Sequence, residues 1–264
     1  MNDTVISNLI SLIEISGSLD NSRGLADRRG LWACDVNTES AYENYSLLTA
    51  RGTDDIDGLV ASGLDFFKSS GNPHIWPIFP ETPPRVKFLL EAGGARYDDT
   101  FFGMTASLPY KAPAVGDDRL REIWLSCGDD TKPWADAVWY GFDSGEPAPE
   151  NFARFVSEIA LRGEIFIFGL TDPVSGVIAA TGLLNLSGTA KETAGIYYVS
   201  TRPEFRRKEW GARVMRGLME KALALGCRAA CLIASPAGRP LYLKCGFEET
   251  ARVEIMIYDY PIVS

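Results

Sequence analysis

The feature that most constrains the fold of this chain is a junction in its C-terminal half, where a strand-like segment runs into a basic loop and then a helix. GIYYVST at 195–201 has the composition of a strand, RRKEWGA at 206–212 follows it, and ARVMRGLMEKALAL at 212–225 carries apolar residues at helical spacing. A helix N-terminus exposes unpaired backbone N–H groups and a partial positive charge. The junction therefore predicts a binding site for an anion.

The segments around this junction predict alternating strands and helices. Strand-like segments at 164–170 and 177–186 flank the turn DPVSG, which predicts an antiparallel hairpin. A helix at 149–163 precedes this hairpin, and the junction is followed by a strand, a short helix and a final strand at 229–234, 239–246 and 253–260. We therefore expect an α/β or α+β fold with a mixed central sheet flanked by helices.

The N-terminal half predicts a smaller domain with the same kinds of element. The spacing of apolar residues predicts a helix over 53–67 with Thr53 as its cap, followed by a strand, a helix and a strand at 74–79, 83–94 and 100–108. Prolines, glycines and the charged DDRLRE then interrupt the pattern, and the Trp-rich segment after them is expected to be irregular. These breaks predict two domains, 1–115 and 116–264.

A short internal similarity suggests that the two halves are related. LLEAGGARYDDT at 89–100 resembles LYLKCGFEET at 241–250, and aligning Gly94 with Gly246 places Leu90 opposite Tyr242. The order of the flanking elements also repeats, which predicts a duplication. The first copy has neither the basic loop nor the tyrosine.

Composition excludes several classes of function. A net charge of −9 argues against general binding to nucleic acid or to an anionic membrane. No apolar run is long enough to span a membrane, and the acidic N-terminus is unlike a signal peptide, so we expect a cytoplasmic protein. The five cysteines are spread out without a CxxC pair, and the one histidine, His74, lies far along the chain from the junction. We therefore expect no metal site and no Ser-His-Asp hydrolase.

The order of strand, R-x-x-x-x-G/A loop, helix, strand and then Tyr242, three residues before a C-G-F helix stop, resembles the GNAT acyltransferase superfamily. The resemblance covers about residues 150–260. It implies a GNAT fold that transfers an acyl group from acyl-coenzyme A to an amine, with a degenerate GNAT-like N-terminal half. In that family the loop reads Q/R-x-x-G-x-G/A and wraps the coenzyme A diphosphate, so Arg206 takes the first place and Gly211 the last. Glu209 stands where the family has its inner glycine, which is a departure from the pattern.

The resemblance also implies roles for individual residues. Tyr242 is the expected proton donor to the departing thiolate, and Glu192, just before the strand, is the nearest carboxylate that could serve as the base. Ser235 stands where family members often have a cofactor-binding asparagine. The residues expected to bind coenzyme A are Val199, Thr201, Arg206, Arg207, Lys208, Glu209, Trp210, Gly211, Ala212 and Ser235.

These observations predict an acetyl-CoA-dependent N-acetyltransferase that acts on a primary amine of a small molecule or peptide. The alternative is a non-catalytic GNAT-fold protein that binds acyl-coenzyme A or serves as an interaction module. Glu209 favours the alternative, whereas Tyr242 favours the enzyme. The acceptor, the acyl chain length and the oligomeric state stay open, with a homodimer among the candidates.

Overall fold

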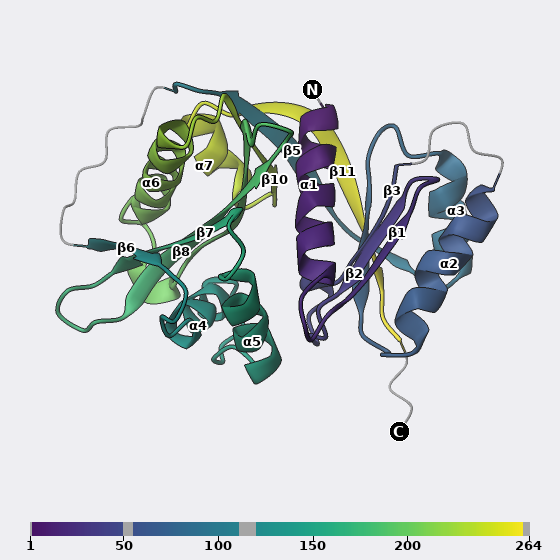
Figure 1. Ribbon diagram of the computed structural model, residues 1–264, viewed down its shortest axis with the longest axis horizontal. Helices are drawn as coiled ribbons and strands as arrows, with labels where there is room; N and C mark the ends of the chain where they lie inside the picture. Colours follow the sequence, from purple (N-terminus) through teal and green to yellow (C-terminus); the bar gives the residue numbers. More distant parts are fainter. Residues whose placement is uncertain (1, 50–54, 111–119, 261–264) are drawn as a thin grey trace. The chain divides into compact units, whose positions relative to one another are not determined.

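The computed structural model describes residues 2–49, 55–110 and 120–260, which fall into two units (Figure 1). Unit 1 comprises Met1–Asn8 and Met104–Thr250, and unit 2 comprises Leu9–Gly103 and Ala251–Ser264. The domain boundary predicted between 115 and 116 lies in 111–119, outside the described residues. Three elements continue from one unit into the other, namely α1 (Asn2–Gly17), β5 (Arg96–Ser107) and β11 (Glu248–Tyr258).

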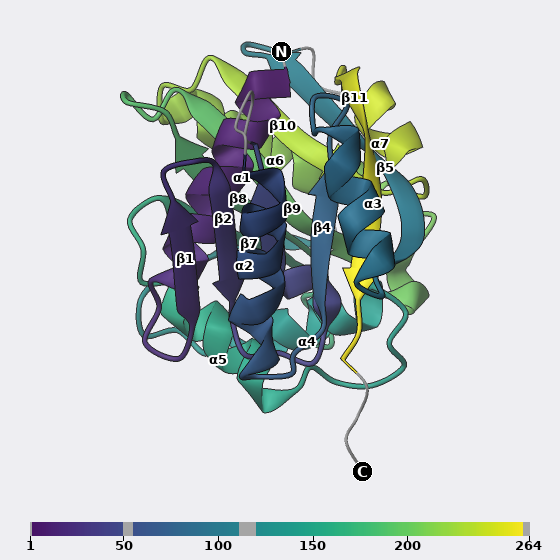
Figure 2. The same ribbon diagram turned by 90° about the vertical axis from the view of Figure 1, so that its right-hand side faces the viewer.

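Unit 2 is built on a mixed sheet with the strand order β1-β2-β3-β4-β11. Strands β1 to β3 are antiparallel, β4 is parallel to β3, and β11 is antiparallel to β4. Figure 2 shows α2 and α3 in front of one face of this sheet. The bounds are β1 (Arg23–Asp27), β2 (Leu31–Asp35), the 3-10 turn η1 (Ala41–Glu43), β3 (Tyr45–Leu48), α2 (Ile56–Lys68), β4 (His74–Ile78) and α3 (Pro84–Ala92).

Helix α2 shows how local sequence and packing combine in unit 2. Its N-cap is Asp55, whose carboxylate accepts a hydrogen bond of 3.1 Å from the Gly58 N–H, whereas the predicted cap Thr53 lies outside the described residues. Its buried side packs on Trp76 of β4 so closely that a Cβ on Gly63 would lie 2.6 Å from the indole ring. Glycine at this position therefore sets the distance between the helix and the sheet.

The strands of unit 1 are also mixed in direction and follow the order β5-β10-β9-β8-β7-β6. The predicted hairpin is confirmed, because β7 and β8 are antiparallel on either side of residues 172–176. The bounds are β6 (Arg121–Leu125), α4 (Lys132–Gly141), α5 (Glu150–Ile159), β7 (Ile165–Thr171), β8 (Ile178–Ser187), β9 (Thr193–Thr201), the 3-10 turn η2 (Pro203–Phe205), α6 (Trp210–Ala224), β10 (Ala229–Ala234) and α7 (Arg239–Lys244). The predicted mixed α/β fold, with helices flanking the sheet, is confirmed.

The Trp-rich segment that we expected to be irregular is helix α4, so that expectation was wrong. Trp134, Ala137 and Val138 are buried at helical spacing, and the Trp134 indole N–H donates a hydrogen bond of 2.7 Å to the carbonyl of Phe168 on β7. Two alanines on the buried side weakened the apolar periodicity that would have marked a helix.

The two faces of the unit 1 sheet carry different helices (Figure 1). Helix α4 packs on β8 and β9. Helix α6 approaches β8 from the other face, where a Cβ on Gly182 would lie 2.7 Å from Leu218 and 2.8 Å from Val214. The absence of a side chain at Gly182 lets α6 lie close to the middle of the sheet.

The N-terminal end of α1, which sequence reasoning did not predict as a helix, belongs to unit 1 through buried polar contacts. The Asn8 side chain donates hydrogen bonds of 3.0 Å to the Asn185 carbonyl and 2.7 Å to the Ser187 hydroxyl, and the Tyr197 hydroxyl donates one of 2.8 Å to Asn8 Oδ1. Gly195 allows this approach, because a Cβ there would lie 1.7 Å from Asn8 Oδ1.

The two units share one order of elements. In each, antiparallel strands, β1 to β3 in unit 2 and β6 to β9 in unit 1, lead to a helix, a strand, a short helix and a last strand, as α2-β4-α3-β5 and α6-β10-α7-β11. The sheet of unit 2 includes β11 beside β4, and the sheet of unit 1 includes β5 beside β10. Gly94 and Gly246, which the sequences align, both have positive φ angles (101° and 83°) after the short helix.

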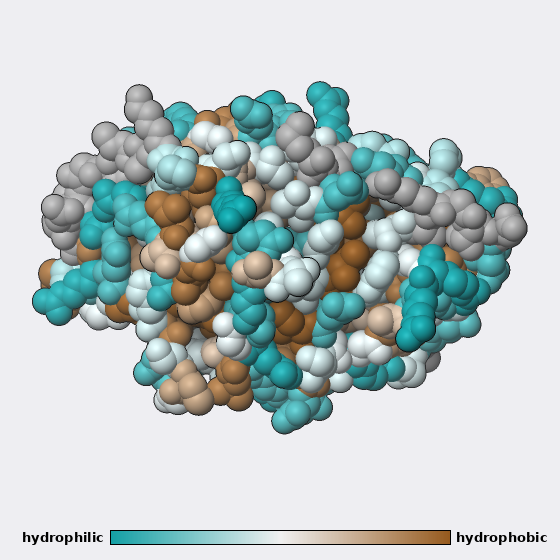
Figure 3. All heavy atoms as spheres, turned by 45° about the horizontal axis from the view of Figure 1, so that its top comes forward, coloured by the Kyte–Doolittle hydropathy of each residue, from teal (hydrophilic) through white to brown (hydrophobic). Residues whose placement is uncertain are grey.

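On the face drawn in Figure 3, hydrophilic side chains surround smaller hydrophobic areas. Among the helices of the described residues, none is both long enough and apolar enough to cross a membrane.

Candidate functional site

Strand β9 contains a β-bulge, and only its first residues pair with the neighbouring strand β10. Its parallel pairing with β10 covers Thr193–Gly195 and Ala229–Cys231. Its register with β8 shifts between Thr181 and Leu183, so that Tyr198 and Val199 together lie opposite Gly182. Tyr198 has a left-handed φ of 52°, as expected for a β-bulge that redirects a strand. The second half of β9 therefore has an edge that β10 does not cover.

The predicted cofactor-binding residues Val199 and Thr201 lie in this half of β9. The Arg202 N–H donates to the carbonyl of Ala179 on β8, and neighbouring residues of a strand point their backbone groups to opposite edges. The backbone groups of Val199 and Thr201 therefore point to the uncovered edge. The Thr201 carbonyl accepts a hydrogen bond of 3.1 Å from Arg206 Nε.

The basic loop after β9 has a backbone that gathers N–H groups. Arg207 and Glu209 have left-handed φ angles of 61° and 58°, and Lys208 between them does not. Alternation of the two hands turns successive N–H groups toward one point and forms an anion-binding concavity. Glu209 is also the N-cap of α6 and makes no side-chain capping bond, so the first N–H groups of the helix face the same region.

The left-handed Glu209 explains how this residue can stand where the family has a glycine. Its φ and ψ of 58° and 14° are the conformation that glycine adopts without steric cost. Glu209 therefore has a backbone conformation open to glycine, and it adds a carboxylate at this position.

A pocket of about 290 Å³ lies at this loop. It is lined by seven of the predicted cofactor-binding residues and by three that sequence reasoning did not select: Thr201, Arg206, Arg207, Glu209, Trp210, Gly211 and Ala212, with Phe205, Leu241 and Lys244. Glu209 is among the residues that line the pocket. Leu241 and Lys244 are three residues apart on α7 and therefore share one side of that helix. The same spacing in RPLYLKCGF was the signal that could have identified them.

The basic side chains of the loop differ in what they contact. The Arg206 guanidinium forms an ion pair of 2.9 Å with Asp143 and donates a hydrogen bond of 2.8 Å to the Gly141 carbonyl at the end of α4. Lys208 Nζ lies 5.0 Å from the ring centroid of Trp210 and 5.7 Å from that of Phe205. Arg206 thus holds the loop to α4, and Lys208 covers the aromatic pair.

Tyr242 and Ser235 follow β10. Tyr242 is 9% exposed, its ring contacts Phe247 edge-on at 6.1 Å, and burial raises the pKa of its phenol. The phenol therefore stays protonated at neutral pH. The Ser235 hydroxyl accepts a hydrogen bond of 3.2 Å from the Gly238 N–H before α7. Neither residue lines the pocket at the loop.

Glu192 lies at the other end of β9 from the loop. Its carboxylate accepts a hydrogen bond of 2.9 Å from the Ala190 N–H, and its carbonyl accepts one of 2.8 Å from the Arg228 N–H. The nine residues of β9 separate it from the loop by roughly 30 Å at about 3.3 Å per residue. The structure therefore does not bring Glu192 and the basic loop together.

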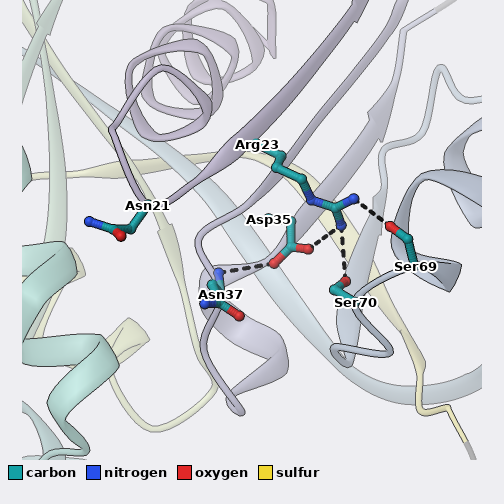
Figure 4. Close-up of a pocket in the computed structure, with 6 residues that line it drawn as sticks. All are labelled: Asn21, Arg23, Asp35, Asn37, Ser69 and Ser70. Atoms are coloured by element: carbon teal, nitrogen blue, oxygen red, sulfur yellow. Dashed lines mark hydrogen bonds and ion pairs between the residues drawn. The ribbon is translucent and has the colours of Figure 1, made fainter.

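A second pocket, of about 300 Å³, lies in unit 2 (Figure 4). Arg23 forms an ion pair of 2.5 Å with the buried Asp35 and donates hydrogen bonds to Ser69, Ser70 and the Phe66 carbonyl at the end of α2. Asp35 also accepts hydrogen bonds from Asn37 and Asn72. These polar groups form hydrogen bonds with one another. Through them, Arg23 of β1 and Asp35 of β2 are held to the end of α2.

Two buried titratable groups in unit 2 have strongly shifted pKa values. His74 stacks on Phe67 at 3.9 Å, and burial lowers the pKa of its imidazole to about 4. Glu43 is 6% exposed, and burial raises the pKa of its carboxyl to about 7. Neither group belongs to the pocket at the basic loop.

Unit 1 thus has a parallel strand pair, β9 and β10, that ends early, and a helix α6 whose N-terminus has no side-chain cap. Residues 128–247 match the acetyltransferase (GNAT) family. Over 133 residues, 48% of this chain and 88% of the relative, the chain is 27% identical to a glucosamine 6-phosphate N-acetyltransferase of Arabidopsis thaliana.

Solved structures show the same fold. A GCN5-related N-acetyltransferase from Kribbella flavida has a TM-score of 0.68 at 13% identity, covering 98% of this chain and 97% of that one. A tandem GNAT protein from the clavulanic acid biosynthesis pathway has a TM-score of 0.62 at 11% identity, covering 100% and 97%. The chain therefore has the fold of GNAT proteins, and its residues 128–247 match the GNAT family.

Proposed function

We propose that this protein is an N-acetyltransferase that uses acetyl-CoA as the acetyl donor and a primary amine of a small molecule or peptide as the acceptor. The observation that supports it most is the contrast between two helix N-termini. That of α6 has no side-chain cap and opens on a pocket with basic residues, whereas that of α2 is capped by Asp55, which also pairs with Arg29. Of these two N-termini, that of α6 lies at a pocket among the described residues.

The residues at the pocket fit the diphosphate of coenzyme A. The N–H groups of the loop from Arg207 to Ala212 and the dipole of α6 stabilise an anion there. Gly211 leaves space beside the backbone, where a Cβ would already lie 3.0 Å from Leu241. When bound, acetyl-CoA supplies an acetyl thioester as the electrophile. The uncovered backbone edge at Val199 and Thr201 is suited to bind an extended amide-containing arm as a further strand would.

The chain's own residues then account for the proton transfers. The amine must lose a proton, and Glu192, which lies at the other end of β9 from the loop, is proposed to accept it through water. The departing thiolate must gain a proton, and Tyr242 is the proposed donor because its buried phenol is neutral at pH 7. The Ser235 hydroxyl is proposed as a hydrogen-bonding group for the cofactor.

The two units take different parts in this proposal. Unit 1 is the catalytic GNAT domain, and unit 2 is a degenerate copy that does not bind coenzyme A. Supporting this, unit 2 has Asp55 in place of the open helix N-terminus and Leu90, fully buried, where the alignment has Tyr242. A cytoplasmic location and a homodimer stay predictions.

A thermal-shift titration with acetyl-CoA tests the proposal. A ligand that binds only the folded protein must raise its melting temperature. No shift at millimolar acetyl-CoA would refute both the enzyme and the acyl-CoA-binding alternative. If binding is seen, thiol release is measured with a panel of amines, including an amino sugar phosphate because of the name of the Arabidopsis relative. Binding without turnover on any amine would favour the non-catalytic alternative.

Glu192 is tested separately from the cofactor. Glu192→Gln keeps the shape of the side chain and removes its capacity to accept a proton. Turnover should therefore fall, whereas the affinity for acetyl-CoA should stay unchanged. The pH profile of kcat/KM is the readout, because loss of a base removes the rise of the rate with pH. An unchanged profile would assign the proton transfer to water alone.

A further inference from the structure

The segment after α4 contains a carboxylate in an unfavourable local position. Asp143 follows the end of α4 with a left-handed φ of 62°, and its N–H donates a hydrogen bond of 3.1 Å to the Tyr140 carbonyl in the last turn. A left-handed position after a helix favours glycine or asparagine, and a negative charge there is repelled by the C-terminal end of the helix dipole. Local preference therefore does not account for an aspartate at this position.

The carboxylate of Asp143 has a tertiary partner in the Arg206 guanidinium, at 2.9 Å. The same guanidinium donates hydrogen bonds of 2.8 Å to the Gly141 carbonyl and 3.1 Å to the Thr201 carbonyl. A planar guanidinium holds several acceptors at fixed angles, which a lysine ammonium does not. Arg206 therefore joins the basic loop to the end of α4 and to the end of β9.

The end of α4 is a firm support for the loop, because it packs tightly on β9. A Cβ on Gly141 would lie 2.6 Å from Ser200 Cβ and 3.1 Å from the Thr201 nitrogen. The guanidinium of Arg202, just after β9, lies 4.5 Å from the centroid of the Tyr140 ring. The ends of α4 and β9 thus form one packed body, and the Arg206 side chain fastens the loop to it.

The loop needs such support, since its backbone is strained. Arg207 and Glu209 have φ angles of 61° and 58°, which are disfavoured for a residue with a Cβ and persist only where the surrounding structure holds them. The same alternation of hands turns the N–H groups of the loop toward one point. Arg206 directly precedes this strained segment, so its contacts fix where the segment begins.

Resting on the function proposed above, we infer that Asp143 is a positioning residue of the cofactor site, which acts through Arg206 to hold the basic loop in its anion-binding shape. Asp143 does not line the pocket, so its effect on a ligand there passes through Arg206. Arg206 then serves as the anchor of the loop, and its charge is not a ligand of the diphosphate. If the Asp143 carboxylate instead competed with phosphate for Arg206, its removal would change the affinity in the opposite direction.

The test compares variants of the full chain by titration calorimetry with acetyl-CoA. Asp143→Asn should weaken binding by about two- to fivefold, the size of an exposed ion pair, whereas Asp143→Glu keeps the carboxylate and should stay within about twofold of the natural sequence. Arg206→Lys keeps the charge but loses the fork of donors, so it should weaken binding by about tenfold. With an amine that is turned over, Asp143→Asn should raise the KM for acetyl-CoA and leave kcat unchanged.

A second measurement follows the loop without any ligand. Trypsin cuts after Arg207 or Lys208 when the loop opens, and the rate follows the population of the open form. In Asp143→Asn these bonds should be cut about two- to fivefold faster than in the natural sequence, because the same ion pair is lost. Glu146→Gln is the matched control, since it removes the same charge from the same exposed segment, and it should change neither the affinity nor the rate of cleavage.

Each outcome decides between the roles. Tighter binding by Asp143→Asn, or unchanged binding by Arg206→Lys, would make Arg206 a phosphate ligand and refute the inference. Equal losses in Asp143→Asn and Asp143→Glu would attribute the effect to the left-handed backbone and not to the carboxylate, and cleavage of Asp143→Asn at the natural rate would also contradict the inference. Failure of the natural sequence to bind acetyl-CoA would refute the proposed function, whereas the rates of cleavage would still decide whether Asp143 holds the loop.

Discussion

Glu209 offers the sharpest test of the site, because replacing it by glycine changes both the backbone strain and the charge. A residue with a Cβ in the left-handed region is disfavoured by about 1–2 kcal/mol. Glycine relieves this but gives the unfolded chain more freedom, which costs about 0.4–1 kcal/mol. It also removes a carboxylate that stabilises a helix N-terminus by about 0.3–1 kcal/mol. These effects nearly cancel, so we expect Glu209→Gly to change the free energy of unfolding by less than about 1 kcal/mol.

The effect on ligand binding should be larger, because Glu209 lines the pocket. Two unit charges at roughly 6 Å in water interact by about 0.7 kcal/mol, so a carboxylate facing a doubly charged diphosphate costs about 1.4 kcal/mol. Removing it should tighten acetyl-CoA binding by about tenfold at very low salt. Screening at 0.15 M salt reduces the gain to about threefold.

The assay is titration calorimetry with acetyl-CoA at two salt concentrations, together with thermal unfolding of the unliganded protein. Glu209→Gln is the control, since it removes the charge but keeps the strained backbone. Both variants should gain affinity, and the gain should be larger at low salt. If neither binds more tightly, the carboxylate does not act on the diphosphate. A gain in the glycine variant alone would attribute the effect to the backbone.

Three further predictions concern Tyr242 and the buried groups of unit 2. Tyr242→Phe should lower kcat by about 10²- to 10⁴-fold with acetyl-CoA affinity nearly intact, as measured by thiol release and calorimetry, since the phenol acts on the leaving group; equal activity would reduce Tyr242 to packing. Glu43 has a folded pKa of about 7, raised from 4.5, so the folded state binds the extra proton, and stability falls as pH rises from 4.5 through 7. Glu43→Gln should therefore have a free energy of unfolding up to about 3 kcal/mol larger than that of the natural sequence at pH 8, and a similar one at pH 4.5. Chemical unfolding at both pH values measures this. The same difference between the two proteins at both pH values would contradict it. His74 has a folded pKa of about 4, lowered from 6.5, so the unfolded state binds the extra proton and stability falls as pH drops from 6.5 through 4. From pH 6.5 to pH 4, the free energy of unfolding of His74→Phe should fall by about 3 kcal/mol less than that of the natural sequence. An equal fall in both proteins would show that His74 does not cause the loss of stability.

Sequence alone was enough for the local elements of the second half of the chain. The hairpin of β7 and β8, the helix α6 and the strand β9 each follow from periodicity and turn residues within a few positions. The basic loop was identified for the same reason, because an anion site at a helix N-terminus is built from residues that are contiguous in the sequence. Seven of the residues chosen from that loop and from β9 line the pocket.

Tertiary structure alone decided which of those residues are available and which others join them. Arg206 is engaged by Asp143 and Gly141, far from it in sequence, while Lys244 reaches the pocket from α7. The bulge at Tyr198 and the end of the β9–β10 pairing are also set by neighbouring strands. The composition of each unit likewise depends on long-range pairing, since β11 joins β4. Local propensity fixes elements, whereas partners distant in the chain fix which edges and charges stay open.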